Sequence, residues 1–155
     1  MIVRKATEAD LAAVSACLAE AFEPYRDCYT PGAFSDTVLT VDAARLRLAH
    51  MTILVAEDRG SIAGTIGFEA GADGEGHLRG MALRRAAQGS GVAAMLLEAA
   101  EDGLRRHGCS RVTLDTTRPL ERAIAFYVRH GYAPTGTIAD FYGMDLIEYA
   151  KMLGR

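Results

Sequence analysis

Residues 81–93 of this 155-residue chain read Met-Ala-Leu-Arg-Arg-Ala-Ala-Gln-Gly-Ser-Gly-Val-Ala, an apolar strand end followed by a glycine loop and a helix start. The loop, residues 88–93, joins a predicted strand that ends at Leu83 to a helix predicted over residues 91–106. A helix start exposes unpaired backbone N–H groups with partial positive charge, and glycines let an anion approach the backbone closely. The spacing therefore predicts either a phosphate site or a tight strand-to-helix turn that binds no ligand.

Two other nucleotide-binding motifs are weak alternatives for this loop. Residues 89–94 fit the loose dinucleotide pattern G-x-G-x-x-A, but in that fold the glycines directly follow a first strand and open a βαβ unit. Here residues 84–88 separate the strand from the first glycine, and an antiparallel meander comes first. The phosphate loop of nucleoside-triphosphate enzymes needs Lys followed by Ser or Thr, where this chain has Ala93 and Ala94.

Hydrophobic periodicity on both sides of the loop predicts the other helices and strands. Before the loop we expect a strand over residues 2–5, a helix from Thr7 to about Phe22, a helix over 43–50, and strands over 52–57, 61–68 and 77–83. Pro24, Pro31 and Gly32 are expected to break up the segment between the two helices. After residues 91–106 we expect a strand over 112–115, a helix over 121–130, and strands over 135–140 and 146–153. This order, β-α-α-β-β-β-α-β-α-β-β, predicts a mixed α/β sheet in a single domain over residues 1–155.

The composition is that of an ordinary globular domain, with 50% hydrophobic and 24% charged residues. The net charge is −3 and the Lys and Arg residues form no block, which argues against a nucleic-acid partner. The densest basic group is either solvated surface or a rim that attracts phosphate; it consists of Arg79, Arg84 and Arg85. The cysteines are too few and too irregularly spaced to predict a disulfide framework or a zinc site; they are Cys17, Cys28 and Cys109.

The start of the chain lacks the apolar core of a signal peptide. No apolar run approaches the ~20 residues that a membrane-spanning helix needs. Cys17 falls on the apolar face of the first predicted helix, where a small buried side chain is the default interpretation. We therefore expect a soluble protein in the reducing cytoplasm, with no membrane partner.

A second motif follows the glycine loop at residues 123–132, which read Ala-Ile-Ala-Phe-Tyr-Val-Arg-His-Gly-Tyr. Together the two motifs resemble those of the GNAT superfamily of acyl-CoA-dependent N-acyltransferases. Its cofactor motif, Q/R-x-x-G-x-G/A, is matched by Gln88, Gly91 and Ala93, and its second segment, A-x-x-F-Y-x-x-x-G-F/Y, by residues 123–132. The resemblance covers essentially the whole chain. It implies a predominantly antiparallel central sheet flanked by helices, acetyl-CoA as co-substrate, and no metal.

The resemblance also implies where the cofactor lies. The strand that ends at Leu83 would splay from the strand near residues 112–115, and the pantetheine arm would lie in the gap, hydrogen-bonded to the backbone at Met81 and Leu83. The pyrophosphate would rest on N–H groups of the loop. The implied cofactor-binding positions are Met81, Ala82, Leu83, Gln88, Gly89, Ser90, Gly91, Val92 and Ala93. One departure is Leu120, which stands where many family members carry an Asn that contacts the cofactor; this contact is either lost or supplied by Thr116 or Thr117.

The implied reaction is acetyl transfer to an amine by direct attack through a tetrahedral intermediate. Tyr127 matches the family's general acid, and a phenol with a pKa near ~10 can protonate a thiolate whose thiol has a pKa near ~8.5. The alternative for Tyr127 is a core aromatic residue on an amphipathic helix. His77 and Glu69 are the candidate bases. Both lie on central strands, and the sequence does not fix the face of the sheet toward which either side chain points. Asp115 either orients a water or merely ends its strand.

The acceptor site of the family is built from the first helices and the loop between the last two strands. Here those segments carry the candidate substrate contacts Tyr25, Tyr29, Phe34 and Tyr142. The absence of a basic or acidic tract favours a small primary amine or an amino-acid-like metabolite as acceptor. A peptide N-terminus is the second choice, and a non-catalytic acyl-CoA-binding regulatory domain is the alternative from another class. A homodimer is a possibility that the resemblance raises.

Overall fold

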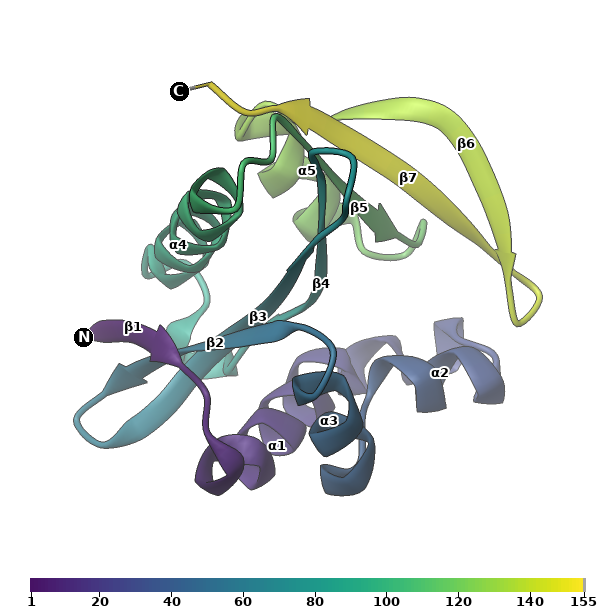
Figure 1. Ribbon diagram of the computed structural model, residues 1–155. Helices are drawn as coiled ribbons and strands as arrows, with labels where there is room; N and C mark the ends of the chain where they lie inside the picture. The colour runs from purple at the N-terminus through teal and green to yellow at the C-terminus, as the bar shows by residue number, and fades with distance from the viewer. Residues whose placement is uncertain (155) are drawn as a thin grey trace.

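A seven-stranded sheet forms the centre of the protein, with strand order β1-β2-β3-β4-β5-β7-β6 (Figure 1). The computed structural model describes residues 1–154. The strands are β1 (Ile2–Lys5), β2 (Thr52–Asp58), β3 (Ser61–Ala70), β4 (Glu75–Leu83), β5 (Arg111–Thr116), β6 (Ala133–Phe141) and β7 (Met144–Met152). Neighbouring strands are antiparallel except for β4 and β5, which run parallel. The predicted mixed, mostly antiparallel sheet is confirmed.

Helices cover both faces of this sheet (Figure 1). One face carries α4 (Val92–Arg106) and α5 (Glu121–Arg129), and the other carries α1 (Leu11–Phe22) and α3 (Val41–Leu48). The short helix α2 (Pro31–Thr37) lies between α1 and α3 in the chain. A turn connects the end of β4, one of the two parallel strands, to the long helix α4.

Each face has its own apolar core because the central strands are buried on both sides. In β2, Leu54 and Ala56 point into the core beneath α4, whereas Ile53 and Val55 point into the core beneath α1. This double burial explains why β2 reads as a continuous apolar run and not as an alternating one. Cys17 is fully buried in the core beneath α1, as its helical spacing predicted.

The parallel pairing of β4 with β5 ends long before β4 does. It joins Glu75–Leu78 to Arg111–Leu114, and the remainder of β4, through Leu83, has no pairing with β5. Gly80 lies just beyond the last pair with a φ of 68°, and the register of β4 with β3 shifts in the same region. The left-handed φ and the shift together turn β4 away from β5, since bulges bend a strand. The splay that the resemblance implied is present.

The structure contains one helix that the sequence analysis did not predict. Pro31 and Gly32 appeared to break up this segment, but Pro31 occupies the first turn of α2 and Thr30 caps the helix by accepting a hydrogen bond from the Ala33 N–H at 3.3 Å. Proline is well tolerated at a helix start because its missing N–H has no partner there in any case. The helix predicted over residues 43–50 begins two residues earlier, at Val41, and ends at Leu48.

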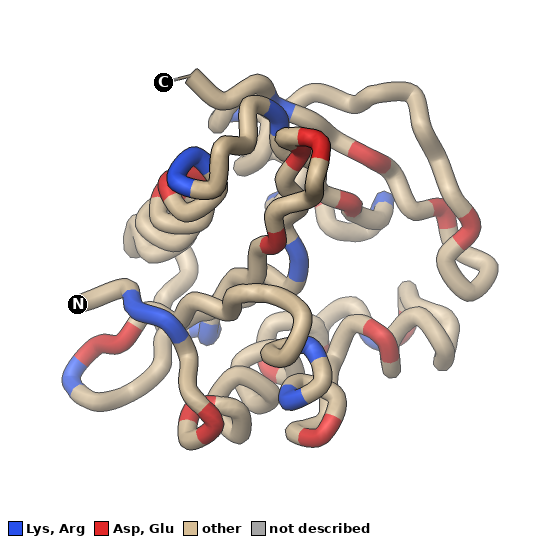
Figure 2. The backbone as a smooth tube through the Cα atoms, viewed as in Figure 1, with Lys and Arg blue, Asp and Glu red and all other residues tan. Residues whose placement is uncertain are grey.

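Charged residues are spread over the whole fold. Figure 2 shows Lys and Arg positions interspersed with Asp and Glu positions, with no continuous basic stretch along the backbone. Many of these charges are paired across short distances, including Arg45 with Asp42 at 2.6 Å and Arg111 with Glu75 at 2.6 Å. Within residues 1–154, no helix combines the length and the apolar character required to traverse a bilayer.

Candidate active site

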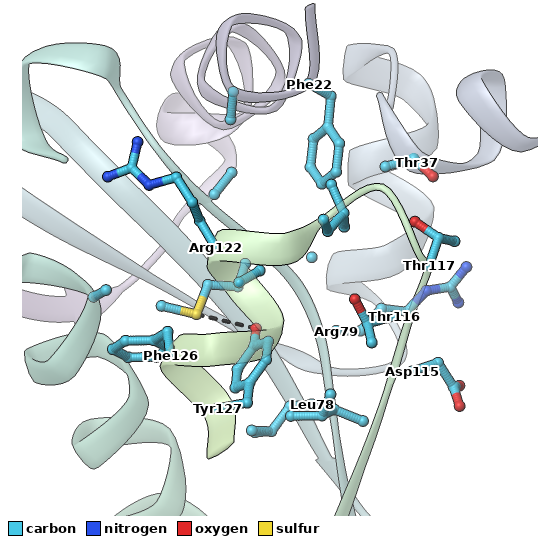
Figure 3. Close-up of a pocket in the computed structure, with 18 of the residues that line it drawn as sticks. Phe22, Thr37, Leu78, Arg79, Asp115, Thr116, Thr117, Arg122, Phe126 and Tyr127 are labelled. Atoms are coloured by element: carbon cyan, nitrogen blue, oxygen red, sulfur yellow. Dashed lines mark hydrogen bonds between the residues drawn. The ribbon is translucent and has the colours of Figure 1, made fainter. Parts of the chain in front are cut away.

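A cavity of about 850 Å³ opens where β4 leaves β5. Its walls come from the splayed end of β4, the glycine loop, the end of β5, one side of α5, the segment after α1, and the turn between β6 and β7. This volume is in the range of sites that enclose small molecules and cofactors. Figure 3 shows some of the lining side chains, among them Tyr127, Arg122 and Asp115.

Most of the predicted cofactor-binding residues line this cavity. They are Met81, Ala82, Leu83, Gln88, Gly89, Gly91 and Ala93. The structure does not bring the side chains of Ser90 and Val92 into it. Val92 is 1% exposed and belongs to the core beneath α4, while the Ser90 hydroxyl donates to the carbonyl of Ala87. Any contact from these two positions to a ligand would have to come from the backbone.

The glycine loop presents the start of α4 to the cavity. Gly89 and Gly91 have φ values of 77° and 88°, and a Cβ on either would meet no atom within 4 Å. Gly91 is the N-cap of α4 and no side chain caps the helix. The N–H groups of the first turn thus have no side-chain acceptor, and together with the helix dipole they form a site for an anion.

The backbone of β4 turns polar groups toward the gap. Ala82 pairs with Thr65 of β3, and the N–H of Arg84 donates to the carbonyl of Ala63 at 2.8 Å. Because successive peptide groups of a strand point to opposite sides, those of Met81 and Leu83 point away from β3 and toward the gap. These are the two positions at which an extended ligand could pair with the strand edge.

Tyr127 lies on α5 with its hydroxyl directed at β4 (Figure 3). The hydroxyl donates a hydrogen bond to the sulfur of Met81 at 3.3 Å, and the ring packs edge-on against Tyr132. The side chain is buried, and this burial raises the pKa of the phenol well above its ordinary value. Tyr127 is therefore protonated at neutral pH and borders the cavity as a proton donor.

His77 on β4 and Asp115 on β5 form a polar pair near the end of the β4–β5 pairing. The Nε2 of His77 lies 3.6 Å from Oδ2 of Asp115, and its Nδ1 lies 2.9 Å from Oγ1 of Thr113. His77 and Asp115 both line the cavity and are each about one third exposed (33%). Partial burial raises the pKa of the Asp115 carboxyl, an effect that the neighbouring His77 opposes and that Glu148 reinforces.

Glu69, the other candidate base, is separated from this group. It lies opposite His77 in the β3–β4 register, but it is exposed and does not border the cavity. The physical reason is that β3 is one strand farther from the splay than β4. The structure brings Tyr127, His77 and Asp115 to one cavity and leaves Glu69 outside it.

The aromatic residues predicted for the acceptor site divide in the same way. Tyr25, Tyr29 and Tyr142 line the cavity. Tyr29 is anchored by a hydrogen bond of 2.6 Å between its hydroxyl and Oγ1 of Thr117, and burial raises its pKa. Phe34 does not line the cavity: it packs edge-on against Tyr29, with the guanidinium of Arg26 4.3 Å from the centre of its ring. Phe34 thus supports a wall residue from behind.

Several lining residues were missed from the sequence; they include Asp36, Thr37, Arg47 and Arg122. Arg122 donates to Oε1 of Gln88 at 3.3 Å and supplies a cation beside the glycine loop. Helical spacing could have found it, because Arg122 precedes the lining residue Phe126 by one turn. Of the basic group predicted beside the loop, Arg84 and Arg85 do not line the cavity, and Arg84 lies 3.6 Å from Glu20.

The position of Leu120 is also resolved by the structure. It lines the cavity as the N-cap of α5, and no side-chain hydrogen bond caps the helix. Leucine at this position can contribute apolar contact but no hydrogen bond to a ligand. The adjacent threonine, Thr117, lines the cavity as well, but its hydroxyl is engaged by Tyr29.

Comparison with known proteins gives a consistent result. The sequence pattern of the Acetyltransferase (GNAT) family matches residues 18–132. No curated protein matches the chain in sequence. One similar solved structure is the ribosomal-protein-alanine N-acetyltransferase of Brucella melitensis, with 23% identity, a TM-score of 0.78 and coverage of 99% of this chain and 100% of that one. Another is the PaiA N-acetyltransferase of Thermoplasma acidophilum in complex with coenzyme A, with 18% identity, a TM-score of 0.84 and 98% coverage of both chains.

A third similar structure is that of YncA from Salmonella typhimurium, solved with acetyl-CoA. Its sequence is 22% identical, its TM-score is 0.73, and the match covers 100% of this chain and 95% of that one. At these identities the structural matches show a shared fold and nothing more specific. The family match rests on the sequence itself, and it includes the glycine loop, Tyr127 and most of the cavity wall.

Proposed function

The chain belongs to the Acetyltransferase (GNAT) family, and from this premise we propose that it transfers the acetyl group of acetyl-CoA to the nitrogen of a primary amine. The observation that carries the proposal is the meeting of three features in one cavity. These are the unpaired edge of β4 at Met81 and Leu83, the uncapped start of α4 at Gly91, and the protonated phenol of Tyr127.

The residues of the cavity fit acetyl-CoA. The gap between β4 and β5 has the shape of a missing strand, which suits a pantetheine arm that pairs with the backbone at Met81 and Leu83. The glycine loop offers N–H groups to a pyrophosphate, with Arg122 as a nearby cation. Two of the similar structures contain coenzyme A or acetyl-CoA. When bound, the co-substrate supplies an activated acetyl thioester.

Tyr127 is the proposed proton donor to the departing thiolate. Its raised pKa keeps the phenol protonated, and its hydroxyl reaches the strand edge at Met81, where the thioester end of the arm is proposed to lie. A phenol holds its proton more firmly than a thiol, but the transfer needs only that the thiolate receives it as the bond to sulfur breaks. The sulfur of Met81 is a weak acceptor, so the hydroxyl can exchange partners at little cost.

His77 is the proposed base that takes a proton from the incoming ammonium, directly or through a water. An amine attacks only as the neutral form, and an imidazole can accept a proton near neutral pH. Asp115 lies 3.6 Å from Nε2 of His77, where its carboxylate stabilises the imidazolium that forms. Glu69 is no longer preferred because it does not border the cavity.

For the acceptor we propose a small primary amine or an amino-acid-like metabolite. The support is the tyrosine-lined wall built by Tyr25, Tyr29 and Tyr142, which is concave and suits a small molecule. A peptide N-terminus is the second candidate, and it is favoured by the similarity to the ribosomal-protein-alanine N-acetyltransferase of Brucella melitensis.

The test is a measurement of thiol release from acetyl-CoA with a mixed panel of amines, amino acids and short peptides, together with calorimetric titration of coenzyme A. Amine-dependent thiol release is the expected result. Tight binding of acetyl-CoA without thiol release for any acceptor would replace the enzyme by a non-catalytic acyl-CoA-binding regulator. Failure to bind coenzyme A at all would overturn the assignment of the cavity.

A further inference from the structure

Arg47 is a cationic side chain of the cavity that forms no ion pair within residues 1–154. Arg47 extends from α3 to β4, where its Nη1 lies 2.7 Å from the position that a Cβ on Gly80 would occupy. Gly80 has a φ of 68° and lies at the point where β4 turns away from β5. A glycine at this bend therefore gives the guanidinium direct access to the strand, one residue before Met81.

The charges around Arg47 compensate it only in part. The carboxylate of Asp36 attracts Arg47, but it is paired with Arg79 at 3.0 Å. Within residues 1–154, the guanidinium of Arg47 has no side-chain hydrogen bond and no carboxylate within ion-pair distance. Partial burial, with repulsion from Arg79 as the second cause, lowers the pKa of Arg47 to about 10, so it still carries its charge at neutral pH.

A half-buried charge without a partner is unfavourable. Proteins retain such a charge mostly where a ligand or another group supplies the opposite charge. The guanidinium group suits a carboxylate, since its planar fork can donate two parallel hydrogen bonds. Arg47 lies on the side of β4 proposed to hold the acceptor, away from the glycine loop. The anion that it is placed to bind is therefore a group of the acceptor and not the pyrophosphate.

We infer that Arg47 binds the carboxylate of the acceptor, and that the acceptor is a free α-amino acid; this rests on the proposed function of the cavity. The distance argument is specific. The thioester end is proposed to lie at Met81, and Arg47 lies against the preceding residue, Gly80. Arg47 and the proposed thioester end thus lie at neighbouring positions of β4, and an α-amino acid carries its carboxylate and its amine on one carbon, so a single molecule can reach both.

This inference separates the two acceptor classes that remain open. A free amino acid has a negative carboxylate beside its amine, whereas a peptide N-terminus has a neutral amide at the same place. Bound peptide would leave the charge of Arg47 uncompensated, which penalises it relative to the free amino acid. A simple alkylamine would leave it uncompensated too.

The test compares free L-amino acids with their α-amides, using the twenty common amino acids as the panel and thiol release as the assay. We expect the wild-type protein to have at least a tenfold higher kcat/KM for the best amino acid than for its amide. Arg47→Gln should reduce kcat/KM for the acid by at least tenfold and leave that for the amide within about twofold. Arg47→Lys should be intermediate, because it keeps the charge but loses the fork.

Two further measurements make the result specific to the acceptor. Titration of the best amino acid into the protein with coenzyme A present should show binding that Arg47→Gln weakens in parallel with kcat/KM, while the Kd of coenzyme A stays unchanged. The matched control is Arg45→Gln on the same helix. Arg45 is exposed and paired at the surface with Glu8 and Asp42, so its removal should leave both acceptors unaffected.

Three outcomes would overturn the inference. They are an equal loss for acid and amide in Arg47→Gln, a weakened Kd of coenzyme A, and a wild-type protein that acetylates alkylamines or peptides in preference to amino acids. In each case acetyl transfer itself would stand. Absence of turnover with every acceptor, or of coenzyme A binding, would instead contradict the proposed function.

Discussion

The hydroxyl of Tyr127 donates to the sulfur of Met81 at 3.3 Å, which joins α5 to the part of β4 that has left β5. A thioether is a weak acceptor, so this hydrogen bond holds the phenol in place without engaging it strongly. The proposed proton donor is thus positioned at the edge of β4. Tyr127 lies in the middle of the second sequence motif, residues 123–132, so this contact joins that motif to the splayed end of β4.

The first prediction concerns this phenol. Tyr127→Phe should lower kcat by about 10²-fold, the lower end of the contribution of a positioned general acid. The Kd of acetyl-CoA should change by less than about twofold, because the ring that packs against Tyr132 remains. Steady-state kinetics and calorimetric titration measure the two quantities.

The control for this substitution is Tyr149→Phe, which removes a hydroxyl from a buried tyrosine of β7 that does not line the cavity. It should leave kcat unchanged. An unchanged kcat in Tyr127→Phe would remove Tyr127 from the acid role and return it to core packing.

The second prediction separates the two candidate bases. His77→Gln should lower kcat/KM by about 10²-fold, since general-base catalysis contributes on that order. Glu69→Gln should leave the rate unchanged, because this exposed carboxylate lies outside the cavity. The measurement is kcat/KM of the two variants and the wild type under one set of conditions.

Asp115→Asn extends the same test, because the amide cannot stabilise an imidazolium at 3.6 Å. The expected result is a smaller loss of kcat/KM than that of His77→Gln. A full loss in Glu69→Gln, with His77→Gln active, would reverse the assignment of the base.

The third prediction uses two glycines at opposite ends of α4. Gly91→Ala and Gly108→Ala place alanine at φ values of 88° and 80°, and in neither case does the added Cβ meet an atom within 4 Å. Both should therefore lose about 1 kcal/mol of stability through backbone strain, or roughly 2–4 °C in Tm. Only Gly91→Ala should also weaken the Kd of coenzyme A, by about tenfold, because Gly91 borders the proposed pyrophosphate site.

Gly108→Ala is thus the matched control for strain, and calorimetric titration gives the decisive number. Equal effects of the two alanine variants on the Kd of coenzyme A would mean that the glycine loop is a strand-to-helix turn without a role in binding.

The order of helices and strands along the chain, the glycine loop and the place of Tyr127 could be predicted because each depends on a short stretch of sequence. Gly91 and Gln88 belong to one turn, and Tyr127 is fixed by its own helix and the motif around it. Local patterns of this kind survive folding because they depend on neighbours within a turn or a strand.

The acceptor side could not be predicted in the same way, because it depends on how distant elements pack. Arg47 reaches Gly80 only because α3 lies over the bend in β4. Glu69 and His77 lie opposite each other, yet only the strand that adjoins the splay reaches the cavity. Phe34 was expected in the pocket, but it lies on α2, a helix that was not predicted because Pro31 was interpreted as a break. On this helix the ring of Phe34 packs against Tyr29 and does not line the cavity.

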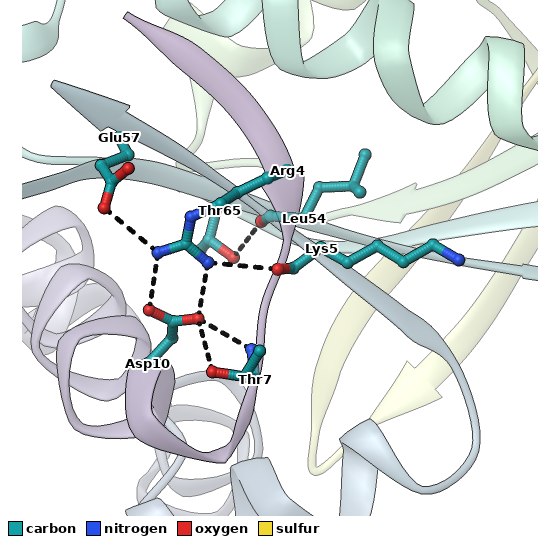
Figure 4. Close-up of polar contacts among 7 residues, drawn as sticks. All are labelled: Arg4, Lys5, Thr7, Asp10, Leu54, Glu57 and Thr65. Carbon is teal, nitrogen blue, oxygen red and sulfur yellow. Dashed lines mark hydrogen bonds and ion pairs between the residues drawn. The ribbon is translucent and has the colours of Figure 1, made fainter.

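The last prediction concerns the ion pair that joins β1 to the start of the first helical segment. Both oxygens of Asp10 accept from the guanidinium of Arg4, at 2.8 and 2.9 Å, and one also accepts from the N–H of Thr7 at 2.7 Å (Figure 4). The hydrogen bonds from Arg4 are the main cause that lowers the pKa of Asp10 well below its ordinary value of 3.8. A carboxyl with a lowered pKa stabilises the fold above its unfolded pKa, and this contribution is lost as the pH falls toward the folded pKa.

Asp10→Asn should therefore lower Tm by roughly 3–6 °C at pH 7, and the difference from wild type should shrink as the pH falls below about 4. Asp42→Asn is the control, since its carboxylate is 92% exposed, and it should change Tm by less than about 1 °C. A Tm difference for Asp10→Asn that is constant from pH 7 to pH 3 would show that the charge of Asp10 contributes nothing and that its shape alone matters.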